Sequence, residues 1–274
     1  MDNRPIGVFD SGIGGLTVVK EILKVMPNEN IVYFGDTARV PYGDRSEDTI
    51  KKFTMECISF LKSKNIKLLI VACNTVSAVA LDLIREELGI ETYGVILPGS
   101  KMANRTTKNH KVGVIGTNAT VNNGAYEKAI LFENNKNVVY SKSCPLFVPI
   151  AEDGLGNSKI ALEAAKYYLK DLIDKDVDCI VMGCTHYPIL ETTIKQVVGR
   201  NVKLINPAKE TVKEVREYLI KTGKISEDNG SAMFFVTDDE NKFKKNLKEV
   251  LEIKEPSIKR INLKTVLSDN KDNE

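Results

Sequence analysis

CIVMGCTH, residues 179–186, is an apolar run that ends in a cysteine and then turns polar at Thr185 and His186. The same pattern occurs 111 residues earlier as LLIVACNT, residues 68–75, where Asn74 and Thr75 follow Cys73. Near-continuous apolar runs of this length are typical of strands buried on both faces of a parallel sheet. Two such strands with a cysteine in the same register indicate a duplicated unit.

Other strand-like segments repeat in the same order. IGVFDSG (6–12) resembles VGVIGTN (112–118), and IVYFGD (31–36) resembles VVYSKS (138–143). Amphipathic stretches such as residues 46–64 and 158–176 lie between strands, and this alternation implies parallel sheets covered by helices. We therefore expect an α/β fold of two pseudo-symmetric domains, each a parallel sheet flanked by helices, with the active site at the domain interface. The expected strands are PIGVFD (5–10), NIVYFGD (30–36), IKLLIVAC (66–73), ETYGVI (91–96), KVGVIGT (111–117), NVVYS (137–141), VDCIVMGC (177–184), VKLIN (202–206) and AMFFVT (232–237).

The composition is that of an ordinary globular protein. The net charge is +2 and the basic residues are spread along the chain, so the sequence shows no basic cluster of the kind that binds nucleic acid or an anionic membrane. No apolar run reaches the roughly 18 residues of a membrane span, and the N-terminus does not read as a signal peptide. Five scattered cysteines favour a reduced, cytoplasmic setting over disulfides. The polar end SDNKDNE, residues 268–274, is expected to fray.

Polar side chains follow several of the expected strands. Ligands bind at the carboxyl ends of strands in open parallel sheets. If the two domains face each other, Cys73 and Cys184 approach one pocket from opposite sides. Each thiol precedes an expected helix start, which lowers a thiol's pKa. The residues at these ends are Asp10, Ser11, Asp36, Cys73, Asn74, Thr75, Thr117, Cys184, Thr185 and His186.

Several chemistries compete for these residues. A cysteine in an apolar strand is often a core residue, and the polar residues after it are often helix caps. A zinc site is disfavoured because Cys184 and His186 lack a CxxC or HxxxH partner set and His110 reads as a surface residue. A cysteine hydrolase with His186 as base leaves Cys73 unexplained. GIGGLT (12–17) departs from the dinucleotide fingerprint at Thr17, although its glycines suit a small anion.

One further chemistry uses both cysteines alike. A thiolate on one face of a carbon removes its proton, and a thiol on the opposite face returns one. This inverts a stereocentre without a redox cofactor, and thiols titrate near enough to neutrality for the work. Asp10, Glu152 and His186 would tune the two thiols.

Six motifs resemble the glutamate racemases of the cofactor-independent aspartate/glutamate racemase superfamily. They are FDSGIGGLTV (9–18), YFGDTARVPYG (33–43), ACNTVSA (72–78), VGVIGTNATV (112–121), FVPIAEDG (147–154) and GCTHYP (183–188). The resemblance implies interconversion of L- and D-glutamate for peptidoglycan, hence for cell-wall synthesis and cell shape, with no cofactor and no metal. It also implies a homodimer.

The resemblance assigns roles to particular residues. Cys73 would remove the α-proton of D-glutamate and Cys184 that of L-glutamate. Asp10 would assist Cys73, while Glu152 and His186 would assist Cys184. The residues implied to hold the amino acid are Asp10, Ser11, Tyr42, Gly43, Asn74, Thr75, Thr117, Thr120, Thr185 and His186. The implied domains are residues 1–97 plus 208–274, and residues 98–207. Asn206 departs from the acid or small polar residue of many relatives, which concerns the hinge more than the chemistry.

Two other functions remain open from the sequence. A racemase for another amino acid, such as aspartate, would use the same two thiols. A two-domain binding protein that closes over an amino acid would need no paired cysteines.

Overall fold

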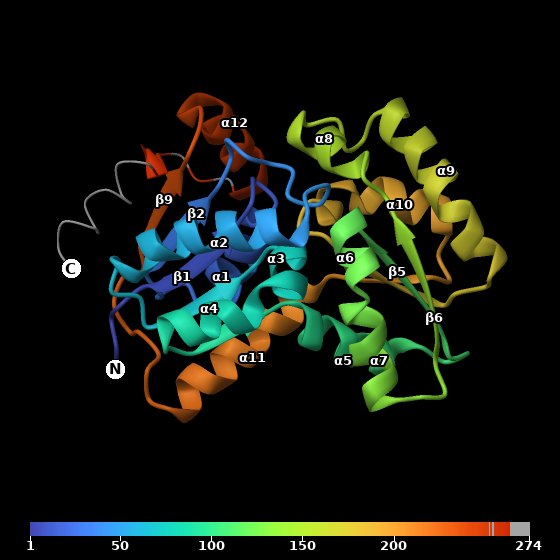
Figure 1. The fold of residues 1–274 in the computed structure, drawn as a ribbon, viewed down its shortest axis with the longest axis horizontal. Helices are drawn as coiled ribbons and strands as arrows, with labels where there is room; N and C mark the ends of the chain where they lie inside the picture. The colour runs from blue at the N-terminus through green and yellow to red at the C-terminus, as the bar shows by residue number, and fades with distance from the viewer. Residues whose placement is uncertain (252, 254, 264–274) are drawn as a thin grey trace.

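The computed structural model describes residues 1–251, 253 and 255–263. The chain forms two lobes that lie side by side, each built on one parallel sheet (Figure 1). The stretch 268–274, expected to fray, lies outside the described residues. No helix in the described part of the chain combines the length and apolar character needed to cross a bilayer.

The first lobe has a six-stranded parallel sheet in the order β10-β9-β2-β1-β3-β4. Its apolar strand side chains alternate between two cores, so both faces need covering. Helices α1, α11 and α12 cover one face, and α2, α3 and α4 cover the other. The strands are β1 (Ile6–Asp10), β2 (Ile31–Gly35), β3 (Leu68–Val71), β4 (Thr92–Gly94), β9 (Ala232–Val236) and β10 (Ser257–Arg260). The helices are α1 (Leu16–Val25), α2 (Glu47–Lys62), α3 (Asn74–Val79), α4 (Leu81–Leu88), α11 (Pro207–Lys221) and α12 (Glu240–Leu251).

The second lobe has a four-stranded parallel sheet in the order β6-β5-β7-β8. Helices α8, α9 and α10 contribute to the core on one face, and α5 and α7 to the core on the other. The strands are β5 (Lys111–Gly116), β6 (Val138–Ser143), β7 (Cys179–Gly183) and β8 (Lys203–Ile205). The helical segments are α5 (Ile96–Thr106), α6 (Asn118–Asn123), α7 (Ala125–Glu133), α8 (Phe147–Glu152), α9 (Lys159–Asp174), the 3-10 turn η1 (Tyr187–Leu190) and α10 (Glu191–Val198).

The expected fold class is confirmed, and every expected strand is present. The segment 91–96 forms a shorter strand than expected, because α5 begins at Ile96. Strand β10 was missed because SIKR is a mostly exposed edge strand with no apolar run. The domain limits remain a prediction. Asn206 caps the start of α11, because its side-chain oxygen accepts a hydrogen bond from the backbone N–H of Ala208 at 3.0 Å.

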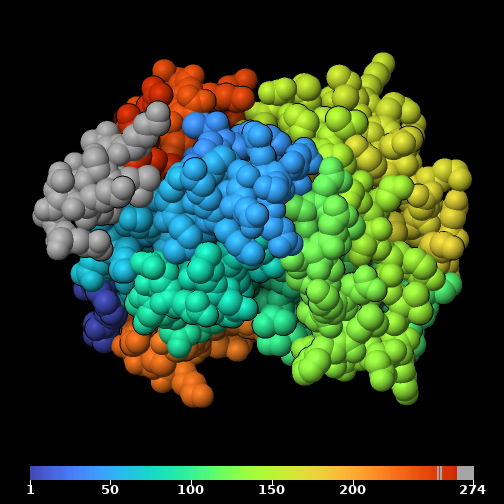
Figure 2. All heavy atoms as spheres, viewed as in Figure 1, coloured from blue at the N-terminus to red at the C-terminus, as the bar shows by residue number. Residues whose placement is uncertain are grey.

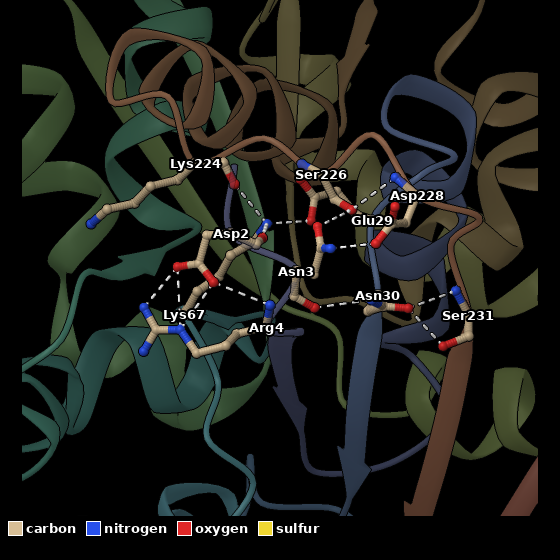
Figure 3. Close-up of polar contacts among 10 residues, drawn as sticks. All are labelled: Asp2, Asn3, Arg4, Glu29, Asn30, Lys67, Lys224, Ser226, Asp228 and Ser231. Carbon is tan, nitrogen blue, oxygen red and sulfur yellow. Dashed lines mark hydrogen bonds and ion pairs between the residues drawn. The ribbon is translucent and has the colours of Figure 1, made fainter.

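A buried ion pair fastens the amino-terminal edge of the first sheet (Figure 3). Lys67 Nζ lies 2.5 Å from Glu29 Oε2, and the two side chains are 0% and 1% exposed. The same ammonium donates to the backbone oxygens of Asp2 at 2.8 Å and Lys224 at 2.9 Å. Glu29 Oε1 accepts from the backbone N–H of Ser226 at 2.9 Å. These contacts join the N-terminus, the starts of β2 and β3, and the loop between α11 and β9.

Candidate active site

The carboxyl ends of strands from both sheets border one small pocket between the lobes. Both Cys73 and Cys184 line it, which is the juxtaposition expected from the duplicated strands. Its free volume is about 10 Å³, close to the space of one water molecule. The lining residues are Ser11, Val40, Pro41, Tyr42, Gly43, Cys73, Asn74, Thr75, Thr117, Val148, Cys184, Thr185 and His186. A larger groove of about 1050 Å³ runs along α4, β4 and α5, but it contains neither thiol.

Cys73 precedes α3 directly and is buried. Its thiol donates to Ser11 Oγ at 3.7 Å. Burial, followed by the negative charge of Asp10, raises the pKa of Cys73 to about 12, although the hydrogen bond from Val76 N–H and the hydrogen bond with Ser11 oppose the rise. The helix start does lower this pKa through the N–H of Val76, as expected, but desolvation outweighs that contribution and the net shift is upward.

Cys184 follows β7 and lies beside a buried histidine. Its sulfur is 3.7 Å from His186 Nδ1, and His186 Nε2 is 2.7 Å from Glu152 Oε1. Burial would lower the pKa of His186, but hydrogen bonds and negative charge from Cys184 and Glu152 raise that pKa well above its ordinary value. Burial would raise the pKa of Glu152, but the hydrogen bond and charge of His186 lower it overall. His186 therefore lies between the sulfur of Cys184 and the carboxylate of Glu152, an arrangement that favours its protonated form.

Asp10 lies at the end of β1 and is fully buried. Its Oδ2 accepts from Thr185 Oγ1 at 3.0 Å, and its Oδ1 accepts from the backbone N–H of Gly12 at 2.9 Å. Burial raises the pKa of Asp10, although the charge of His186 and these hydrogen bonds oppose the rise. Within the described residues Asp10 makes no hydrogen bond to Cys73, so it acts on that thiol through its charge.

Three threonine hydroxyls join the lobes on the other side of the pocket. Thr75 Oγ1 lies 3.0 Å from Thr117 Oγ1 and 3.2 Å from Thr120 Oγ1. Thr75 and Thr117 line the pocket, whereas Thr120 is buried behind them and supports the other two. Asp10 and Glu152 also stand behind the lining residues rather than among them.

The loop between β2 and α2 closes a further side of the pocket. Gly43 approaches the second lobe closely, because a Cβ there would meet Thr117 Cβ at 2.3 Å. The backbone oxygen of Gly43 accepts from Ala119 N–H at 2.9 Å. In Figure 2 the blue atoms of this part of the chain lie directly against the green atoms of the second lobe. The hydroxyl of Tyr42 donates to the buried carboxylate of Asp36, so Tyr42 is anchored within its own lobe.

Sequence reasoning missed some residues that shape the site. Val40, Pro41 and Val148 line the pocket but are apolar, so residue type gave no signal. Tyr33 is fully buried in β2 and donates its hydroxyl to the backbone oxygen of Gly12, which fixes the loop after β1. A tyrosine inside a strand expected to be buried needs a hydrogen-bond partner, and that was the available signal. The described residues contain no group of three His, Cys, Asp or Glu side chains arranged to hold a metal ion.

Residues 6–215 match the family model of the Asp/Glu/hydantoin racemases. The chain belongs to this family. It is 45% identical over 252 residues to a glutamate racemase of Thermoanaerobacter pseudethanolicus, covering 92% of this chain and 94% of that protein. It is 46% identical over 238 residues to a glutamate racemase of Geobacter metallireducens, covering 86% and 88%.

Solved structures agree with the sequence comparisons. The glutamate racemase RacE1 of Bacillus anthracis superposes with a TM-score of 0.92 at 38% identity, covering 96% of this chain and 99% of that one. The glutamate racemase of Francisella tularensis, solved in complex with D-glutamate, gives a TM-score of 0.90 at 39% identity, covering 97% and 100%. The chain is therefore an amino-acid racemase, an isomerase, and the expected family is confirmed.

Proposed function

We propose that this racemase interconverts L- and D-glutamate by proton transfer between two thiols and the α-carbon. The single observation that carries the proposal is that Cys73 and Cys184 line one small pocket from different lobes. The glutamate racemases among its relatives, one of them solved with D-glutamate, support the substrate.

In the proposed mechanism each thiol serves one enantiomer. The Cys73 thiolate removes the α-proton of D-glutamate and becomes a thiol, while the Cys184 thiol donates its proton to the opposite face and becomes a thiolate. The reverse reaction exchanges the two roles. The negative charge of Asp10 raises the pKa of Cys73, which makes the Cys73 thiolate a stronger base toward the α-proton. The His186–Glu152 pair assists Cys184 through the 3.7 Å contact at Nδ1. No redox cofactor enters this exchange of protons.

The remaining lining residues hold the amino acid. Hydroxyl, amide and backbone donors suit its two carboxylates and stabilise negative charge that develops at the α-carbon. Because the free volume is only about 10 Å³, the lobes or their bordering loops must separate to admit glutamate. The proposed contacts are Ser11, Tyr42, Gly43, Asn74, Thr75, Thr117, Thr185 and His186, with Asp10 behind Thr185 and Thr120 behind Thr75 and Thr117.

The proposed setting follows from the family resemblance and the composition of the chain. D-Glutamate would supply peptidoglycan synthesis in the cytoplasm, and the enzyme would act as a homodimer without nucleic acid or membrane. The two domains would be residues 1–97 plus 208–274, and residues 98–207, with the pocket between them.

Incubation with L-glutamate in deuterium oxide tests the reaction. We expect loss of optical rotation and deuterium at the α-carbon, without added pyridoxal phosphate after exhaustive dialysis. If neither signal changes, the proposal is wrong. Faster turnover of aspartate would favour an aspartate racemase, and calorimetric binding of glutamate without turnover would favour a binding protein.

Single-thiol variants test the mechanism. Cys73→Ala and Cys184→Ala should each abolish racemisation. Because the remaining thiol still meets one enantiomer, Cys73→Ala should exchange the α-hydrogen only of L-glutamate, and Cys184→Ala only that of D-glutamate. Racemisation by either variant would rule out the two-thiol mechanism.

A further inference from the structure

Tyr126 of α7 makes a hydrogen bond to a residue of the other lobe. Its hydroxyl donates to Asn74 Oδ1 at 2.6 Å. Asn74 is the first residue of α3 and directly follows Cys73, whereas Tyr126 belongs to the core of the second lobe. The contact therefore links the pocket's first-lobe wall to the scaffold of the second.

The ring of Tyr126 is held in one orientation. Gly99 of α5 and Gly183 of β7 flank it so closely that a Cβ would lie 3.3 Å from Cε1 and 3.1 Å from Cε2, respectively. The side chain is 2% exposed. Burial, with a smaller contribution from Cys184, raises the pKa of Tyr126 well above its ordinary value, so the hydroxyl stays protonated and donates.

This bond determines which group of the Asn74 amide, the oxygen or the NH₂, is available to the pocket. A side-chain amide has an oxygen that accepts and an NH₂ that donates, and Tyr126 occupies the oxygen. Within the part of the chain that the structure describes, Asn74 Nδ2 has no hydrogen-bond partner, and Asn74 lines the pocket. An NH₂ group binds a carboxylate, whereas an amide oxygen repels it.

We propose that Tyr126 is a positioning residue that holds Asn74 with its NH₂ available to a carboxylate of the substrate. The inference rests on the proposed function and adds a residue that does not touch the substrate. Without the hydroxyl, the amide could rotate and present its oxygen to the same carboxylate.

Tyr126→Phe removes only the hydroxyl. We expect the KM for both glutamate enantiomers to rise about three- to tenfold, which is the usual worth of one hydrogen bond, with kcat nearly unchanged. Tyr168→Phe is the matched control, because Tyr168 is a buried tyrosine of the same lobe whose hydroxyl accepts from Leu146 N–H at 3.4 Å. Its KM should equal that of the wild type.

A double-mutant cycle separates positioning from general stability. In an Asn74→Ala background, Tyr126→Phe should raise KM no further, because the group it positions is gone. Asn74→Asp keeps the acceptor for Tyr126 but removes the NH₂, so its KM should also rise. An unchanged KM in Tyr126→Phe or Asn74→Asp, additive effects in the cycle, or a fall in kcat alone would overturn the inference.

Calorimetric titration with D-glutamate, alongside the kinetics, keeps this inference distinct from the proposed function. If the wild type binds glutamate without racemising it, the proposed function fails, and the affinities of the same variants still decide the role of Tyr126. If the wild type racemises glutamate and Tyr126→Phe matches it in affinity and KM, only the present inference fails. A wild type that neither binds nor racemises glutamate would overturn both.

Discussion

The charge of Glu152 should control the protonation of His186. Glu152→Gln preserves the size of the side chain and an oxygen that can accept from His186 Nε2 and from Ile13 N–H, which lie 2.7 and 3.3 Å from Oε1. The substitution therefore removes the negative charge and little else. The side chain of His186 is 3% exposed and that of Glu152 is 12% exposed, so solvent screens their interaction weakly.

The size of the effect follows from the kind of hydrogen bond. A bond to a charged partner contributes about 1.5–3 kcal/mol, and one between neutral groups about 0.5–1.5 kcal/mol. In Glu152→Gln the charged form of His186 should therefore be stabilised less, by the difference between these two contributions, about 1–1.5 kcal/mol. Since about 1.4 kcal/mol corresponds to a factor of ten, the proton affinity of His186 should fall about tenfold and its pKa should fall accordingly.

Nuclear magnetic resonance titration of the imidazole C–H signals measures this directly. The chain has two histidines, His110 and His186. His110 bonds to Asn137 Oδ1 at 2.9 Å, and a His110→Asn variant distinguishes its signal from that of His186. If His186 titrates at the same pH in the wild type and in Glu152→Gln, the electrostatic account of the pair is wrong.

The same pair gives a signed dependence of stability on pH. The pKa of His186 is raised, so its contribution is complete below the ordinary value of 6.5 and is lost as pH rises through the folded pKa. The pKa of Glu152 is lowered, so its contribution is complete above 4.5 and is lost as pH falls through the folded pKa. Thermal unfolding should show the largest destabilisation by Glu152→Gln between pH 4.5 and 6.5; a difference independent of pH would contradict this.

Two further substitutions test the scaffold. Lys67→Met leaves the carboxylate of Glu29 buried without its ion pair, so urea unfolding should show that the free energy of unfolding falls by about 3–5 kcal/mol. We expect kcat and KM to stay unchanged, because the ion pair lies at the strand ends opposite the pocket. The control Lys62→Met, at an exposed ion pair, should lose no more than about 1 kcal/mol, and equal losses would contradict the argument. Gly43→Ala should lower kcat/KM about a hundredfold while the protein still unfolds cooperatively, because its Cβ would collide with Thr117 Cβ and force the lobes out of position. Full activity of that variant would show that the close approach is unimportant.

Local pattern was enough to predict most of the fold. Strands buried on both faces must be apolar throughout, and this made β1, β3, β5 and β7 visible in the sequence. Strand β10 escaped because an exposed edge strand carries no such requirement. The segment 91–96 was expected to be longer because Ile96 suits a strand as well as the first turn of α5.

Cys73 and Cys184 were candidates because each ends a strand in a repeated segment, and this much the sequence determined by itself. Contacts between distant residues came only from the tertiary structure. Thr185 reaches Asp10, Glu152 reaches Ile13, and Tyr126 reaches Asn74.

Burial of the Cys73 thiol also outweighed the lowering of its pKa that was expected from the helix start. The raised pKa of Cys73 depends on how completely the fold removes water from its thiol, and no local pattern encodes that desolvation. The sequence therefore determined which side chains stand at the strand ends, because strand and helix formation are local. The packing of two lobes against each other decided which of those side chains meet, and how their protons are held.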